Sequence, residues 1–151
     1  MVYLKFEELQ VLHELLFCTL GLFHEKFLHR FRKESEQYPG IKKNHIKIIG
    51  FLYRNPVLTA TEIAKMLNME KGSLTTLIDL LAEYGLVNRY EDHQDRRRTL
   101  ISLTDAGRAE MENVMRNTIQ CLNEILADVD PDELQDFIAS LRHVVEFMKK
   151  I

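Results

Sequence analysis

The sequence is poor in cysteine and proline and has no tryptophan. Of its 151 residues, two are Cys, three are Pro and none is Trp. Cys18 and Cys121 fit neither a disulfide framework nor the spacing of metal ligands, which favours a protein of the reducing cytoplasm. The uncharged apolar run from Leu15 to Phe23 is far shorter than the roughly 20 residues that cross a bilayer, so we expect no membrane segment.

Motifs that carry out catalysis are also missing. The sequence contains no nucleophile elbow, no phosphate-binding loop and no paired-carboxylate arrangement. A thiol peroxidase centred on Cys18 would need a basic neighbour to activate the thiol, and the local sequence shows none. We therefore expect a protein that is not an enzyme, has no catalytic residues, and needs neither a cofactor nor a resident metal ion.

An overall basic charge is absent, but basic residues are concentrated in the middle of the chain. The formal net charge is −3. Between Lys42 and Arg98, ten basic and seven acidic residues leave this middle segment at +3, so the two ends together carry −6. A basic segment between acidic ends is compatible with a surface that binds nucleic acid on an acidic body. The composition, 46% hydrophobic and 28% charged, is typical of a soluble globular chain of one domain, residues 1–151.

The segment from Thr59 to Tyr84 predicts two short helices joined by a tight turn. Thr59 begins the first helix with a capping box, because Glu62 three residues later can bond back to the Thr59 amide. The turn lies at residues 68–70, and the second helix extends from about Lys71 to Tyr84. Gly85 then supplies the left-handed residue that ends this helix. The apolar stripes of the two helices comprise Ile63, Ala64 and Leu67, then Leu74, Leu77, Ile78 and Leu81.

The next residues predict a β-hairpin with a strongly charged tip. Residues 86–90 and 99–103 are rich in β-forming residues, and they flank the tip sequence DHQDRRR. A helix–turn–helix followed by such a hairpin is a winged-helix pattern. A helix fits the major groove of B-DNA, and a thin hairpin carrying arginine can enter the narrower minor groove.

The motif GLVNRYEDHQDRRRTLISLTDAG resembles the wing signature of the MarR family of transcriptional regulators, and TATEIAKMLNMEKGSLTTLIDLLAEYGLV resembles that family's recognition segment. The likeness extends more loosely over the whole chain. It implies a mainly α protein with a small β-hairpin wing: a winged helix–turn–helix at residues 41–103, flanked by dimerisation helices at 6–38 and 104–151. It also implies a cytoplasmic homodimer that binds a palindromic double-stranded DNA operator and regulates transcription.

The position of each residue in the recognition helix and the wing gives candidate DNA contacts. Residues early in a recognition helix reach base edges. By the resemblance, Arg97 of the Asp95-Arg96-Arg97 motif enters the minor groove, Asp95 orients a wing arginine, and Arg96 or Arg98 holds phosphate. Thr76 stands where the family often carries arginine, which argues against strong guanine readout there. The candidate set is Lys71, Gly72, Ser73, Thr75 and Thr76 in the helix, and His93, Asp95, Arg96, Arg97 and Arg98 in the wing.

Long amphipathic helices are predicted at both ends of the chain. One extends from about Phe6 to Lys33 and is apolar around much of its circumference, which favours burial against a partner subunit over burial within a monomer. After the hairpin, Thr104 caps a helix whose apolar residues recur every three or four positions from Met111 to Val129, and a last helix begins at Asp130-Pro131. The two ends are expected to interdigitate with a two-fold mate.

The regulatory signal is left open by the sequence. The resemblance implies that a small molecule, an oxidised thiol or a metal modulates DNA affinity, and that repression is the commoner mode. Cys18 is a candidate redox residue, although its apolar neighbours favour simple packing. Histidines near the first helix could hold a metal but are more readily structural. A crevice for an aromatic acid or phenol would be lined by Phe23, His24, Phe27, His45 and Phe51. The main alternative function is a winged-helix assembly module that does not bind DNA.

Overall fold

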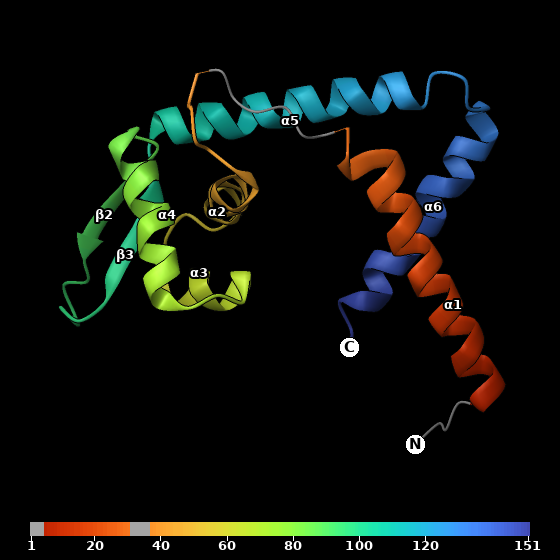
Figure 1. The fold of residues 1–151 in the computed structure, drawn as a ribbon, viewed down its shortest axis with the longest axis horizontal. Helices are drawn as coiled ribbons and strands as arrows, with labels where there is room; N and C mark the ends of the chain where they lie inside the picture. The colour runs from red at the N-terminus through yellow and green to blue at the C-terminus, as the bar shows by residue number, and fades with distance from the viewer. Residues whose placement is uncertain (1–4, 31–36) are drawn as a thin grey trace. The chain divides into compact units, whose positions relative to one another are not determined.

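The computed structural model describes residues 5–30 and 37–151, except for the side chain of Lys71. The chain divides into two compact units, one of residues 1–29 and 119–151 and the other of residues 30–118 (Figure 1). The predicted fold class is confirmed, because helices dominate both units and the strands form one small sheet. The predicted winged helix–turn–helix lies within the second unit.

Helix α2, Lys43–Arg54, begins the described helices of the second unit. A histidine side chain caps its first turn: the Lys42 amide donates to Nδ1 of His45 over 2.9 Å. His45 is only 4% exposed, and burial lowers the pKa of its imidazole. The helix ends at Asn55, whose side-chain amide donates to the Phe51 carbonyl before Pro56 interrupts the backbone pattern.

Helices α3, Ala60–Leu67, and α4, Lys71–Glu83, form the predicted helix–turn–helix. The predicted capping box is confirmed: the Thr59 amide donates to Glu62 Oε2 at 2.7 Å, and the Glu62 amide donates to Thr59 Oγ1 at 3.1 Å. Asn68 takes the left-handed conformation that turns the chain, with φ of 50°. Gly85 ends α4 as predicted, with φ of 68°. These left-handed residues set where each helix stops.

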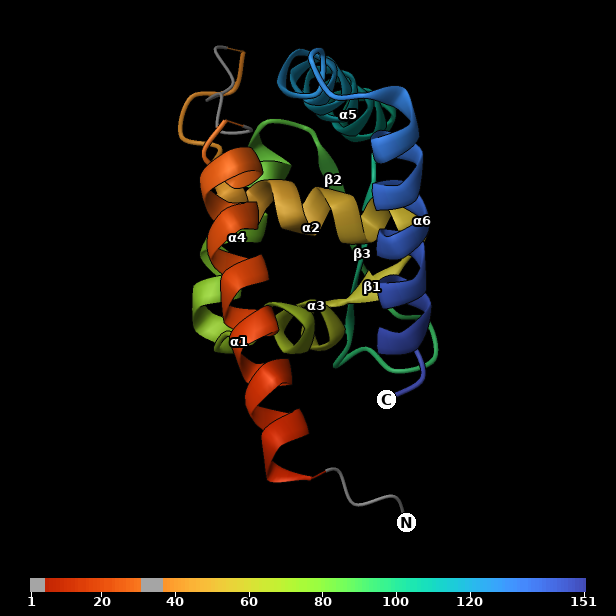
Figure 2. The ribbon, with the colours of Figure 1, turned by 90° about the vertical axis from the view of Figure 1, so that its right-hand side faces the viewer.

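The sheet has three antiparallel strands in the order β1-β3-β2. Strands β2, Val87–Glu91, and β3, Thr99–Leu103, are the predicted hairpin. Strand β1, Leu58–Thr59, pairs with Ile101 and Leu100 and leads directly into α3 (Figure 2). The sequence did not predict β1, because two residues are too short to show alternation.

One apolar core joins the helices of this unit to the sheet. Its members come from the predicted stripes of α3 and α4, from α2, and from the strands. The residues with the least exposure are Ile48, Ile49, Leu52, Ile63, Leu74, Leu81, Leu86 and Ile101. Because the same core holds α4 and both hairpin strands, the exposed face of α4 and the hairpin tip belong to one packed body.

Helix α5, Asp105–Ile125, starts against the base of the hairpin. Thr104 caps it as predicted: the Gly107 amide donates to Thr104 Oγ1 at 3.0 Å, and Thr104 Oγ1 donates to the Gly85 carbonyl at 2.6 Å. A Cβ on Gly107 would lie 2.0 Å from the Leu86 carbonyl oxygen. Only glycine permits this approach of helix to turn.

The first unit contains helix α1, Phe6–Phe23, its one-turn π-helical continuation η1, His24–Leu28, and helix α6, Pro131–Met148. The prediction of one regular helix to Lys33 is wrong at this end, because the amide of His29 bonds to the carbonyl of His24 and widens the last turn. Residues 31–33 lie outside the described part of the chain. Neither α1 nor α6 has a buried residue. No helix among the described residues has the length and apolarity needed to cross a membrane.

Gly107→Ala tests the junction between α5 and the hairpin. The added methyl would clash with backbone atoms that cannot move without displacing the hairpin, so we expect the free energy of unfolding to fall by about 3 kcal/mol. Gly72→Ala is the matched control, because nothing lies within 4 Å of a Cβ there. Urea denaturation without DNA provides the measurement. Equal stability of the two variants would contradict the close approach.

The lowered pKa of His45 predicts that the folded protein loses stability in mild acid. Because burial lowers its pKa in the folded state, the unfolded chain takes up the proton first as pH falls through the usual histidine value of about 6.5. The free energy of unfolding should therefore decrease between about pH 7.5 and 5.5. His45→Asn keeps an acceptor for the Lys42 amide but does not titrate, and should flatten this decrease. Burial raises the pKa of Glu110, which is common to both proteins, so their difference isolates His45.

Candidate nucleic-acid interface

The first two turns of α4 present small and hydroxylated residues on their exposed side. Gly72, Ser73, Thr75 and Thr76 are exposed, while Leu74 between them is buried in the core. This division follows the helical period, because Leu74, Ile78 and Leu81 recur every three or four residues. The side chain of Lys71, the fifth predicted residue of this set, lies outside the described part of the structure. The described members form one polar surface on the helix.

The hairpin tip is held by its own backbone and by aspartates. The Asp92 amide donates to the Arg98 carbonyl at 3.0 Å, and the Arg98 amide donates to the Asp95 carbonyl at 2.9 Å. Asp92 also accepts the Gln94 amide through Oδ1 at 2.9 Å. Such aspartate turns give a tight loop a defined shape without a core of its own. The tip therefore offers its arginines from an ordered base.

Arg97 stands out from this tip. Its side chain is 92% exposed, yet Asp95 Oδ1 accepts from both the Arg97 amide, at 3.1 Å, and its Nε, at 3.2 Å. The pairing predicted between Asp95 and a wing arginine is thus present in the chain. It uses Nε and the main chain, so the outer nitrogens of the guanidinium remain open to solvent.

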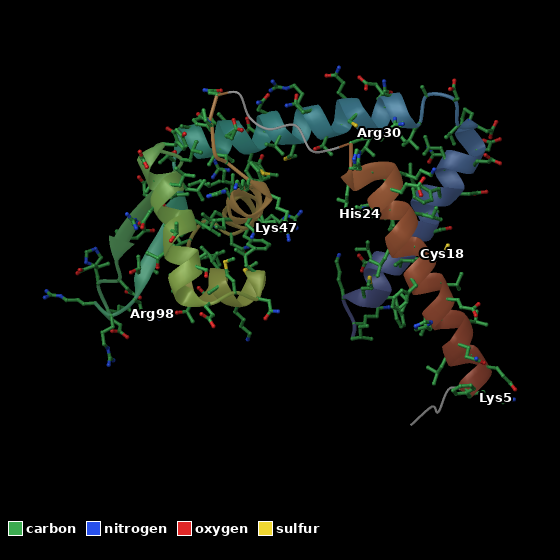
Figure 3. The ribbon with its side chains drawn as sticks, viewed as in Figure 1. Lys5, Cys18, His24, Arg30, Lys47 and Arg98 are labelled. Atoms are coloured by element: carbon green, nitrogen blue, oxygen red, sulfur yellow. The ribbon has the colours of Figure 1, made fainter. Side chains whose placement is uncertain are left out.

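The other wing candidates have different surroundings. Arg98, labelled in Figure 3, forms an ion pair with Asp92, with 3.7 Å between Nη1 and Oδ2. Arg96 is exposed and has no ion pair within the described part of the chain, and His93 is exposed. The two aspartates offset part of the charge of the three arginines. The tip is therefore only moderately basic.

A hollow of about 300 Å³ lies where the hairpin meets the start of α3. Thr59, Ala60, Thr61 and Glu62 line it from α3 and its cap, and residues 97–99 line it from the wing. The hydrogen bonds from Thr59 hold the pKa of Glu62 below its usual value, and Arg98 adds to this effect. Glu62 is therefore ionised at neutral pH and is committed to the cap.

Two residues that sequence reasoning missed connect the helix to the hairpin. Arg89 of β2 donates through Nη1 to Asp79 of α4. Their opposite charges are visible in the sequence. They are ten residues apart on a helix and a strand, however, and no helical or strand period relates them.

The predicted ligand crevice draws on both units. Phe23 and Phe27 stack one turn apart, 5.4 Å between ring centroids, and His24 is exposed beside them in the first unit. His45 and Phe51 belong to the second unit. Nδ1 of His45 already accepts the Lys42 amide, so only its other nitrogen could serve a ligand. The crevice itself stays a prediction.

The thiols and histidines do not form a site within the described residues. Cys18 is an exposed free cysteine on α1 (Figure 3), and Cys121 is half-buried. Cys18 was expected to be packed, but the single chain leaves it uncovered. Over residues 5–30 and 37–151, no group of three or more His, Cys, Asp or Glu side chains could hold a metal ion.

Comparison with known proteins agrees with this arrangement. Residues 41–99 match the sequence model described as the MarR family. The chain is 28% identical over 109 residues to the HTH-type transcriptional repressor YetL of Bacillus subtilis, a match that covers 71% of the chain and 65% of YetL.

Two solved structures illustrate the shared fold. The YusO protein of Bacillus subtilis aligns with a TM-score of 0.70 at 20% identity, over 91% of this chain and 96% of YusO. A mutant of MarR from E. coli, solved in complex with operator DNA, aligns with a TM-score of 0.57 at 22% identity, over 94% and 99% of the two chains. With the wing motif, the capped helix–turn–helix and the match over residues 41–99 in agreement, this part of the chain is similar to the MarR family of winged helix–turn–helix transcriptional regulators.

Proposed function

We propose that the protein is a homodimeric transcriptional repressor that binds a palindromic operator and releases it when a signal arrives. In this proposal α4 lies in the major groove and the hairpin tip reaches the adjacent minor groove. The assigned contacts are those of the described α4 surface, together with Lys71, and of the wing residues His93, Asp95, Arg96, Arg97 and Arg98.

The observation that carries the proposal is the pairing of a polar helix surface with an exposed arginine on one packed body. Threonine methyls can contact thymine, and serine or threonine hydroxyls can bond base edges or phosphates. Arg97 is nearly fully exposed while Asp95 holds its Nε, which supports insertion into a narrow, A·T-rich minor groove. A protein-assembly module would have no need for such an arginine.

The homodimer is proposed from the apolar surface of the first unit. Phe6, Leu15, Phe17 and Leu20 on α1 are each more than 60% exposed in the single chain, as is Phe147 on α6. Soluble proteins rarely leave so many large apolar side chains uncovered. A second copy would cover these side chains. The dimer would then place its two winged helix–turn–helix units about one turn of the DNA duplex apart.

The proposal includes repression of transcription and release of the operator when an effector binds. YetL, a relative at 28% identity, is named as a repressor. An effector would act by binding better to a dimer whose two heads are wrongly spaced for the operator. Candidate entry points are the predicted crevice and Cys18. Cys18 is an exposed free cysteine, so oxidation of its thiol is a second candidate signal.

Selection of DNA from a random duplex pool, followed by binding of the selected site across a salt series, tests the function. We expect a palindrome with half-sites about one helical turn apart and an affinity that falls as salt increases. Failure of a folded, dimeric protein to enrich any site, after removal of bound small molecules and addition of metal, would favour the assembly module.

Arg97→Ala tests the minor-groove contact, with Arg96→Ala as a matched control. Removing Arg97 should weaken operator binding by roughly 10- to 100-fold and remove the preference for A·T pairs under the wing. Removing Arg96 should weaken binding to all sequences by a smaller and similar factor. Fluorescence anisotropy with operators that differ only at the wing position provides the measurement. Equal effects of the two substitutions would contradict the assigned role of Arg97.

Leu20→Glu tests the dimer. Leu20 is 66% exposed in the single chain, so a charge there should leave the protomer folded but disrupt an apolar interface. Sedimentation should change from dimer to monomer, and affinity for the palindrome should fall by roughly 100-fold or more because the two heads no longer bind together. Gln10→Glu, an exposed polar position on the same helix, is the control. A Leu20→Glu protein that remains a dimer would place the interface elsewhere.

A further inference from the structure

The ion pair between Arg89 and Asp79 occupies a distinctive place in the fold. Within the described part of the chain, it is the one ion pair that joins a helix to a strand. The pair of Lys26 lies within η1, that of Lys149 lies at the end of α6, and those of Arg97 and Arg98 stay within the wing. This pair therefore links the recognition helix to the wing by charge.

Asp79 lies directly beside the proposed reading surface of α4. It follows Thr75 by four residues and Thr76 by three, which places all three on neighbouring positions of one helix side. Its neighbour Ile78 is buried in the core, whereas the Asp79 side chain is 54% exposed. The carboxylate thus sits at the border between the packed side of α4 and its polar side.

Arg89 lies at the point where the hairpin leaves the core. It pairs across the sheet with Ile101, which is 1% exposed, and shares a strand face with buried Val87 two residues earlier. After Arg89, Tyr90 and Glu91 are exposed and the chain continues to the arginine tip. The contact with Asp79 is therefore a polar link near the root of the wing.

We propose that the Arg89–Asp79 pair is a positioning contact that sets the angle of the wing relative to α4, so that helix and wing engage DNA together. The inference rests on the proposed function and assigns to Asp79 and Arg89 an indirect role in specificity. A small rotation at the root of the hairpin displaces its tip, and contacts of the tip with a narrow groove depend on its position.

Arg89 is poorly placed to bind a DNA phosphate itself. Its guanidinium is engaged by a carboxylate from α4, which offsets the charge that would attract a phosphate. Exposed ion pairs contribute little to overall stability. The expected consequence of breaking this one is therefore a change in recognition rather than unfolding.

A double-mutant cycle on the full-length dimer tests the role. The proteins are Asp79→Ala, Arg89→Ala, the double variant, and the charge swap Asp79→Arg with Arg89→Asp. Each single variant should bind the selected operator roughly five- to twenty-fold more weakly, the double variant should lose no more than either single one, and the swap should recover part of the loss. The slope of log affinity against log salt should not change, because no phosphate contact is removed.

A second readout links the pair to the wing. Adding Arg97→Ala to Asp79→Ala should cost far less than Arg97→Ala costs alone, since a displaced tip no longer makes its groove contact. Thermal unfolding and sedimentation should match those of the unaltered protein. A role confined to stability would instead lower the melting temperature and leave the cost of Arg97→Ala unchanged, which would overturn the proposal.

Direct contact of Arg89 with phosphate would also overturn it. In that case Arg89→Ala would reduce the salt slope by about one unit, and Asp79→Ala would leave binding unchanged or tighten it. Failure of the proposed function has a different signature, since the unaltered dimer would then select no site. Operator binding that depends on Arg97 but is equal in all four Asp79 and Arg89 variants would refute the positioning role alone.

Discussion

The winged unit depends on the contact between the start of α5 and the turn that follows α4. The Leu86 carbonyl accepts the Thr104 amide at 3.1 Å, while Gly107 brings the α5 backbone against the same carbonyl. Leu86 directly precedes the hairpin and Thr104 directly follows it. Both ends of the wing are therefore closed at one place, and the wing can extend from the core while its root stays fixed.

Burial and exposure divide the roles within this unit. The apolar faces of α2, α3 and α4 and the inner residues of the strands supply a shared core. Small polar residues of α4 and the arginine tip remain outside it. Recognition elements that stand on a rigid core lose little entropy on binding, which allows a modest net charge to support specific contacts. Asp95 and Asp92 fit this arrangement, because they pair with Arg97 and Arg98 and offset part of the positive charge of the wing.

Local signals made much of the unit predictable. The Thr59–Glu62 capping box, the left-handed Gly85, the alternation of the two hairpin strands and the Thr104 cap each depend on residues within a few positions of one another. The two-residue strand β1, the π turn at His24–Leu28 and the use of His45 as a helix cap had no such signature. The pair of Arg89 and Asp79 was missed because it joins different elements. The site residues taken from the wing and the helix remain predictions, which the exposure of Gly72, Ser73, Thr76 and Arg97 supports.

The sequence by itself determined most of the segments that form helices and strands and which side of each is apolar, because these depend on short-range periodicity and on capping residues. It also indicated the resemblance to the MarR family, through the wing motif and the helix–turn–helix. Tertiary structure decided that Arg89 meets Asp79 and that Gly107 must lack a side chain. Those features depend on distances between segments that are remote along the chain, and such distances exist only once the core has packed.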